Sequence, residues 1–114
     1  MELRVTYRDV GVITVVDLGG RITLGEASSL LRKTIRELLD EQRTKIVLNL
    51  ADVNYIDSSG IGELVSAFTA VKKSGGEMKL LQLTKKVHDL LQLTKLFTVF
   101  EVYSDEGAAT QSFR

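Results

Sequence analysis

The sequence predicts an α/β fold, in which a mixed β-sheet opens with an N-terminal antiparallel hairpin and continues in alternating βα units. Two observations lead to this class. First, two strand-like segments separated by a short turn precede any helical pattern. Second, apolar residues at helical spacing then alternate with short aliphatic runs. Such alternation requires parallel strands that are joined by helical crossovers.

The first elements are the two hairpin strands and a helix. Residues 3–7 and 12–18 are rich in β-branched and aliphatic side chains, and residues 8–11 supply the turn between them. A helix follows, because Thr23 and Glu26 have the spacing of a capping box. The apolar stripe of this helix consists of Ala27, Leu30, Leu31, Ile35, Leu38 and Leu39.

A buried strand and a second helix come next. The strand is predicted at residues 45–50, and the helix carries an apolar stripe of Ile61, Leu64, Val65, Phe68 and Val71. Two lysines and two glycines at residues 72–76 are typical of a helix C-terminus. The rest of the chain predicts a strand at 78–81, a short helix capped by Thr84, a strand at 99–103 and a last helix from Ser104.

Composition limits the possible functions of the chain. A length of 114 residues, of which 44% are hydrophobic, predicts a single domain over residues 1–114. Fifteen basic and fifteen acidic residues give zero net charge, so neither nucleic acid nor an anionic membrane is an expected partner. Cysteine is absent and His88 is the single histidine, so no metal or cofactor is expected.

No part of the sequence predicts insertion into a membrane or export. No apolar run approaches the roughly 20 residues that span a bilayer. The N-terminus also lacks the apolar core of a signal peptide. A cytoplasmic location is therefore expected.

The most informative residues are Asp57, Ser58, Ser59 and Gly60, which lie where the buried strand ends and the second helix begins. Backbone N–H groups at a helix N-terminus lack partners and carry positive partial charge, which would stabilise a phosphate on a serine there. Serines also occur at helix starts as simple caps, so local chemistry leaves both interpretations open.

The glycines of this segment predict a close approach of another molecule. Gly60 and Gly62 each lower helix propensity by up to ~1 kcal/mol relative to alanine. That cost favours the approach of a partner over tight packing inside the chain. Tyr55, Ile56 and Ile61 would frame the site, although both isoleucines could equally belong to the core.

The longer stretch Val53–Gly62, with the sequence Val-Asn-Tyr-Ile-Asp-Ser-Ser-Gly-Ile-Gly, resembles the signature of the STAS-domain anti-sigma-factor antagonists. Residues 47–50 and 75–78 also resemble that family, and the resemblance covers nearly the entire chain. It implies a STAS-like fold. In the family the first serine after the aspartate accepts a phosphate, which by position is Ser58.

The resemblance also implies the partners. In this family the unphosphorylated antagonist binds an anti-sigma factor that is also a serine kinase, and frees the sigma factor. Phosphorylation ends the binding and a serine phosphatase resets the switch. The chain would be the kinase's substrate, with no catalytic residues of its own, and a monomer or weak dimer. The partner-binding residues implied are Asp57, Ser59, Gly60, Ile61, Gly62, Thr23 and Gly25.

One position departs from the family pattern. Many members carry an aspartate where this chain has Thr23, at a position that the family links to partner or nucleotide contact. Nucleotide binding is therefore not expected. The departure leaves open an alternative function, as a STAS component of a larger sensory assembly with a different partner.

Two rival classes find less support. A receiver domain phosphorylated on Asp57 would need further acids at the end of the first strand to hold a divalent cation, and Tyr7-Arg8-Asp9-Val10 stands there. An enzyme with Ser58 as nucleophile would need a base. His88 lies beside Asp89 in a polar phase of its helix and is expected at the surface.

Overall fold

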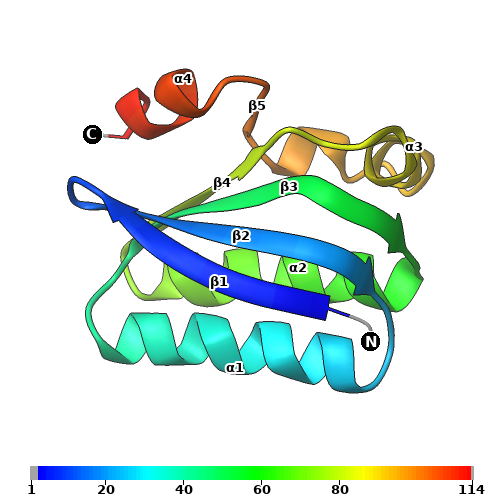
Figure 1. The fold of residues 1–114 in the computed structure, drawn as a ribbon, viewed down its shortest axis with the longest axis horizontal. Coiled ribbons are helices and arrows are strands. Elements are labelled where there is room, and N and C mark those ends of the chain that lie inside the picture. Colours follow the sequence, from blue (N-terminus) through cyan, green and yellow to red (C-terminus); the bar gives the residue numbers. More distant parts are fainter. Residues whose placement is uncertain (1–2, 114) are drawn as a thin grey trace.

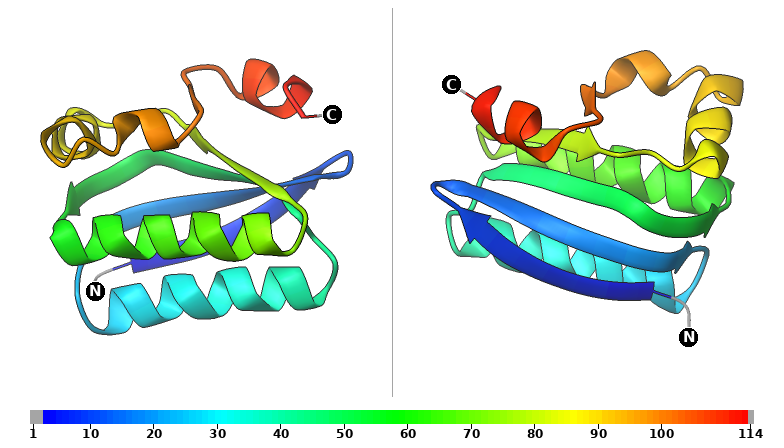
Figure 2. Two further views of the ribbon diagram at one scale, coloured as in Figure 1. Left: turned by 180° about the vertical axis from the view of Figure 1, so that it is seen from behind. Right: turned by 45° about the horizontal axis from the view of Figure 1, so that its top comes forward.

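The computed structural model describes residues 3–113 as one five-stranded sheet with helices on both faces (Figure 1). Helices α1 and α2 cover one face and α4 lies on the other (Figure 2). Helix α3 packs at the end of β3, and its Val87 and Leu91 join the same core as α1 and α2. The elements are β1 (Leu3–Val10), β2 (Ile13–Ile22), α1 (Glu26–Asp40), β3 (Lys45–Ile56), α2 (Ser58–Lys73), β4 (Glu77–Leu81), α3 (Lys85–Leu93), the 3₁₀ helix η1 (Phe97–Val99), β5 (Val102–Tyr103) and α4 (Glu106–Gln111).

The sheet is mixed, as predicted. Its strands follow the order β1-β2-β3-β4-β5, in which β1 and β2 are antiparallel and every later pair is parallel. Because side chains alternate along a strand, Val16 and Leu48 pack in the larger core with α1 and α2, while Val15 and Val47 pack in a smaller core with Ala109 of α4. The central strands are thus covered on both faces.

The hairpin turn differs from the prediction. Val10 pairs with Ile13, so the turn consists of Gly11 and Val12, and Gly11 has a φ of 63°. Arg8 belongs to β1 instead, where its guanidinium bonds to Asp17 at 2.8 Å and to Glu106 of α4 at 2.7 Å. These bonds to Arg8 lower the pKa of both carboxyl groups. The polar residues that suggest a turn therefore hold α4 against an exposed edge strand.

The C-terminal region matches the prediction only in part. Strand β4 and helix α3 are confirmed, including the cap of α3 by Thr84. The strand predicted at 99–103 is wrong over its first half, because η1 and the buried Phe100 precede a strand of two residues. The last helix begins at Glu106 rather than Ser104, and the side chain of Asp105 caps it.

Strand β3 runs on to Ile56, well beyond the predicted end at Leu50. The extension is paired with β2 through two register shifts, up to the pair of Ile22 and Ile56. Helix α2 then starts at once, as predicted, and ends with lysines 72 and 73 before Gly75 at a φ of 82°. Within residues 3–113, no helix is both long enough and apolar enough to cross a bilayer.

Candidate functional site

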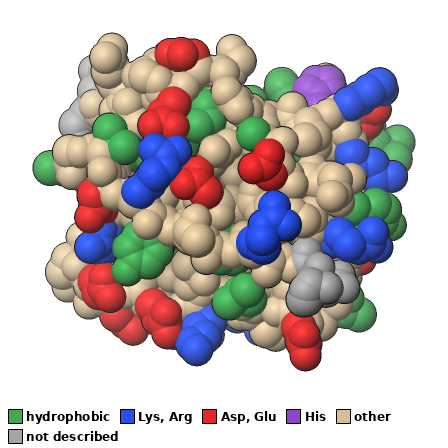
Figure 3. Space-filling view, viewed as in Figure 1, with side chains coloured by type: hydrophobic (Ala, Val, Ile, Leu, Met, Phe, Trp, Pro, Cys, Tyr) green, Lys and Arg blue, Asp and Glu red, His purple; other side chains and the backbone are tan. Residues whose placement is uncertain are grey.

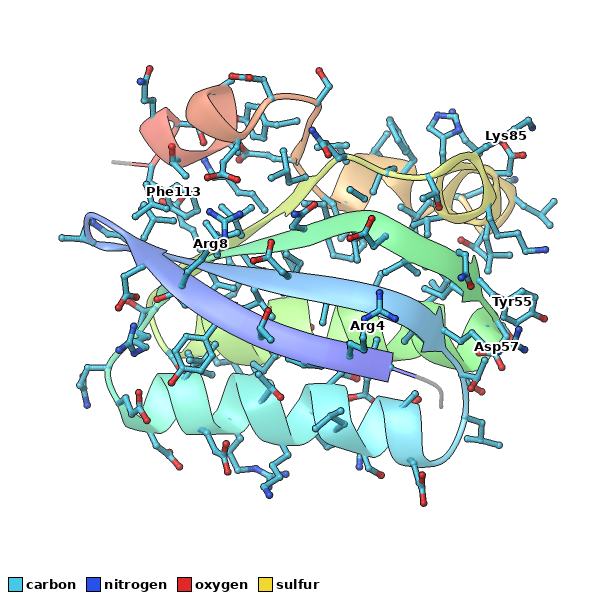
Figure 4. All side chains as sticks on the ribbon, in the orientation of Figure 1. Arg4, Arg8, Tyr55, Asp57, Lys85 and Phe113 are labelled. Atoms are coloured by element: carbon cyan, nitrogen blue, oxygen red, sulfur yellow. The ribbon has the colours of Figure 1, made fainter. Side chains whose placement is uncertain are left out.

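The candidate site lies at the edge of the sheet where β2 and β3 both end. Ile22 and Ile56 are register partners, and the Asp57 N–H donates to the Ile22 carbonyl at 3.4 Å. The loop of residues 23–25 therefore lies beside the turn from β3 into α2. Figure 4 labels Tyr55 and Asp57 at this edge. The carboxyl ends of parallel strands are a common place for binding sites in α/β folds.

Asp57 is the N-cap of α2. It has an extended backbone, and its carboxylate accepts a hydrogen bond from the Gly60 N–H at 2.8 Å. The interpretation of Ser58 or Ser59 as the cap is therefore wrong, and the two serines are the first residues of the helix. Ser58 is exposed, and within residues 3–113 its hydroxyl has no hydrogen-bond partner. The capping function and a free hydroxyl thus belong to different side chains.

This division predicts different stabilities for two alanine variants. Asp57→Ala should lower the free energy of unfolding by about 1 kcal/mol, because an N–H of the first turn loses its acceptor. Ser58→Ala should leave it nearly unchanged, because the hydroxyl makes no bond within the described chain. Urea unfolding of both variants measures the difference. An equal loss in the two variants would contradict the assignment of the cap.

Gly60 and Ile61 belong to the interior. A Cβ on Gly60 would lie 2.2 Å from the Ile22 carbonyl oxygen, so the backbone that approaches this glycine is that of β2. The prediction that a partner's approach explains Gly60 is therefore wrong. Ile61 is 2% exposed and, like Ile56, packs in the core. Gly62 is exposed, and a Cβ on it would meet no atom within 4 Å, so it remains open to a partner.

The predicted capping box at Thr23 is also wrong. Helix α1 begins at Glu26 with Gly25 as N-cap, and no side chain caps it. Gly25 has a φ of 103°, which is outside the helical region and would be strained for a residue with a side chain. The helix can therefore begin only after Gly25. Thr23 instead uses its backbone carbonyl, which accepts from the Ser28 N–H and hydroxyl at 3.2 and 2.8 Å.

A cleft lies beside Ser58. The end of β3 and the start of α2 form one wall of it, and helix α3 forms the other. The cleft has a volume of about 420 Å³ and is lined by Tyr55, Ile56, Asp57, Ser58, Lys86, Asp89, Leu90 and Leu93. The Thr84 hydroxyl fixes the start of α3 on β3 by donating to the Val53 carbonyl at 2.9 Å. The sequence predicts α3 but not its position, so Lys86 and Leu93 are site residues that sequence reasoning missed.

The edge of the molecule on which β3 ends combines apolar and basic side chains (Figure 3). Leu24 and Leu93 are 77% and 79% exposed, and sequence reasoning missed both. The Arg21 guanidinium lies 4.4 Å, and the Lys86 ammonium 5.0 Å, from the centre of the Tyr55 ring. Asp89 accepts from Lys85 at 2.6 Å, and this bond lowers the pKa of Asp89.

The rival functions gain no support from this geometry. His88 is half exposed, as predicted, and its ring packs against Phe97 outside the lining of the cleft. Asp9 lies in β1 next to the hairpin and pairs with Thr14 at the start of β2, whereas Asp57 follows the other end of the paired strands β2 and β3. The two aspartates therefore do not come together as the acids of a receiver domain would. Among the described residues, no group of three histidines or acids could hold a metal ion.

Comparison with known proteins identifies the family. The STAS domain model matches residues 4–109. The anti-sigma-B factor antagonist of Bacillus subtilis is 32% identical over 96 residues, which cover 84% of this chain and 86% of that protein. The crystal structure of tm1081 from Thermotoga maritima superposes with a TM-score of 0.85 at 27% identity, covering 96% of this chain and 94% of the other.

The Bacillus protein SpoIIAA shares the fold in both of its solved states. Its unphosphorylated form has a TM-score of 0.78 at 21% identity and covers 95% of each chain. Its phosphorylated form has a TM-score of 0.74 at 20% identity and covers 95% of this chain and 97% of the other. With the family model matched over almost all described residues and the sheet order observed, the chain belongs to the STAS domain family.

Proposed function

We propose that this chain is an anti-sigma-factor antagonist that is switched by phosphorylation of Ser58. Unphosphorylated, it binds an anti-sigma factor that is also a serine kinase and so frees the sigma factor. Phosphorylation by that kinase ends the binding, and a serine phosphatase restores it. The name of the Bacillus subtilis relative supports this function, as do the phosphorylated and unphosphorylated structures of SpoIIAA.

The observation that carries the proposal is the exposed hydroxyl of Ser58 at the first position of α2. A kinase can reach it, and the serine oxygen can take the γ-phosphoryl group of ATP while ADP leaves and the hydroxyl proton is lost. The product carries about −1.5 to −2 charges at the positive end of a helix dipole. The fold can therefore tolerate the modification, while the charge of the surface around Ser58 becomes much more negative.

The proposed binding surface surrounds Ser58 and differs in four residues from the set predicted from the sequence. Asp57, Ser59 and Gly62 contribute from the start of α2, and Thr23 and Gly25 from the neighbouring loop. The exposed side chains of Leu24 and Leu93 add apolar contacts. Gly60 and Ile61 would act from the interior, by fixing the start of α2. We place the interaction in the cytoplasm, with the antagonist as a monomer or weak dimer.

Phosphate mapping tests the assignment of Ser58. The wild-type protein should capture the kinase from a cell extract, and addition of ATP should then place one phosphate on the bait at Ser58. Ser58→Ala should remove this acceptor, whereas Ser59→Ala should retain it. Peptide mapping by mass spectrometry measures the site. A main acceptor at Ser59 or Thr23 would overturn the assignment, and capture of a large assembly without a kinase would favour the sensory alternative.

A further inference from the structure

We propose that Lys86 is the intramolecular partner of the phosphate on Ser58, so that the phosphorylated protein forms an ion pair across the cleft between α2 and α3. This inference rests on the proposal that Ser58 is the acceptor. It adds a residue of α3 to the switch and states how the phosphorylated form is stabilised.

The backbone holds Lys86 and Ser58 on two walls of one cleft. Lys86 lies in the first turn of α3, which the Thr84 hydroxyl fixes to β3 at the Val53 carbonyl. The same strand leads through Tyr55 into Asp57 and Ser58. Figure 4 shows Tyr55, Asp57 and the neighbouring Lys85 at this end of the molecule. Both groups are therefore anchored to the end of one strand.

Lys86 is available to a new anion. No carboxylate within residues 3–113 pairs with it, and its ammonium lies over the Tyr55 ring, 5.0 Å from the ring centre. Lys85 differs, because it bonds to Asp89 at 2.6 Å. A cation at a ring face is held weakly where water has access, so Lys86 can turn toward a phosphate.

The other charged groups of the site leave this role to Lys86. The two carboxylates of the cleft are both engaged, Asp57 by the Gly60 N–H and Asp89 by Lys85. Among the neighbouring elements, β2 contributes Arg21 beside Tyr55 and α1 contributes Glu26 in its first turn. The first turn of α2 contains no acid. A phosphate on Ser58 would therefore share the cleft with one uncompensated cation, that of Lys86.

The ion pair has a measurable effect on the phosphate itself. A nearby cation favours the dianion and so lowers the second pKa of phosphoserine, which is about 6 without such a partner. For an exposed pair of charges a few ångströms apart, removal of the lysine should raise this pKa by about 0.5 unit. Phosphorus NMR reads the titration directly and is independent of partner binding.

The experiment uses the full chain with phosphoserine inserted at position 58 during translation, so that no kinase is needed. Phosphorus NMR titrations are recorded for the otherwise wild-type protein and for Lys86→Gln, Lys86→Arg and Lys85→Gln. We expect Lys86→Gln to raise the phosphate pKa by about 0.5 unit, Lys86→Arg to retain the low value, and Lys85→Gln to have a clearly smaller effect.

Lys85→Gln is a demanding control, because it removes the same charge one residue away and also releases Asp89 toward the cleft. Equal shifts for Lys85→Gln and Lys86→Gln would overturn the proposal, since the phosphate would then sense only the general charge of α3. No shift for Lys86→Gln would overturn it too. Failure of a kinase to modify Ser58 would instead overturn the proposed function, and the two failures are therefore distinguishable.

Discussion

Phosphorylation of Ser58 should weaken binding to the anti-sigma factor by more than a hundredfold, with almost no change in the stability of the fold. The phosphate would lie beside Asp57 within the interface, where both negative charges would have to be desolvated against a surface that matched a neutral hydroxyl. A loss of ~3 kcal/mol is enough for this change in affinity. The helix N-terminus accommodates the same charge in the free protein.

Calorimetric titration of the kinase with unmodified and stoichiometrically phosphorylated protein measures the change in affinity, and thermal unfolding measures the fold. Ser58→Asp should reproduce part of the loss, because it adds one charge instead of nearly two. Ser58→Ala is the matched control and should still bind, since it changes the size of the residue little and adds no charge. Equal affinities of the unmodified and phosphorylated proteins would rule out the switch.

Gly60→Ala should cost about 3 kcal/mol of stability, whereas Gly62→Ala should be neutral or stabilising by up to ~1 kcal/mol. The added methyl at residue 60 would overlap the Ile22 carbonyl oxygen at 2.2 Å and the Ile56 Cγ1 at 2.6 Å. At residue 62 it would meet no atom within 4 Å. The two glycines are two positions apart on one helix, so helix propensity affects both alike.

Urea unfolding of the two variants measures these free energies. A partner-binding assay on Gly62→Leu, which should remain folded, then tests whether Gly62 lies in the interface. Similar stability losses for both alanine variants would mean that the contact between α2 and β2 is looser than the structure indicates.

Local sequence patterns predicted the parts of the fold that local chemistry determines. The start of α2 and the cap of α3 depend on residues within one turn, and both were predicted correctly. The extent of β1 was not, because an exposed edge strand carries polar residues such as Arg8 and Asp9 that resemble a turn. Strand β5 was predicted too long, because Phe100 is buried by tertiary packing outside any strand.

The candidate site also combines features that depend on local sequence, which could be predicted, with features that depend on tertiary contacts, which could not. The position of Ser58 at a helix start follows from the order of residues along the chain, and the structure agrees. The role of Gly60 depends on contact with Ile22, which is distant in sequence, so periodicity could not show it. Lys86 and Leu93 reach the cleft only because α3 packs at the end of β3. The capping box failed because Gly25 adopts a positive φ that the sequence permits but does not require.

The capping of α2 by Asp57 also has an evolutionary consequence. Because the side chain of Ser58 makes no hydrogen bond within the described chain, natural selection can act on this position with almost no penalty to folding. Descendants with alanine there would bind constitutively, and those with aspartate would bind poorly at all times. If Ser58 is the switch residue, as proposed, one codon change would yield a paralogue that binds constitutively or one that binds weakly, with the same fold.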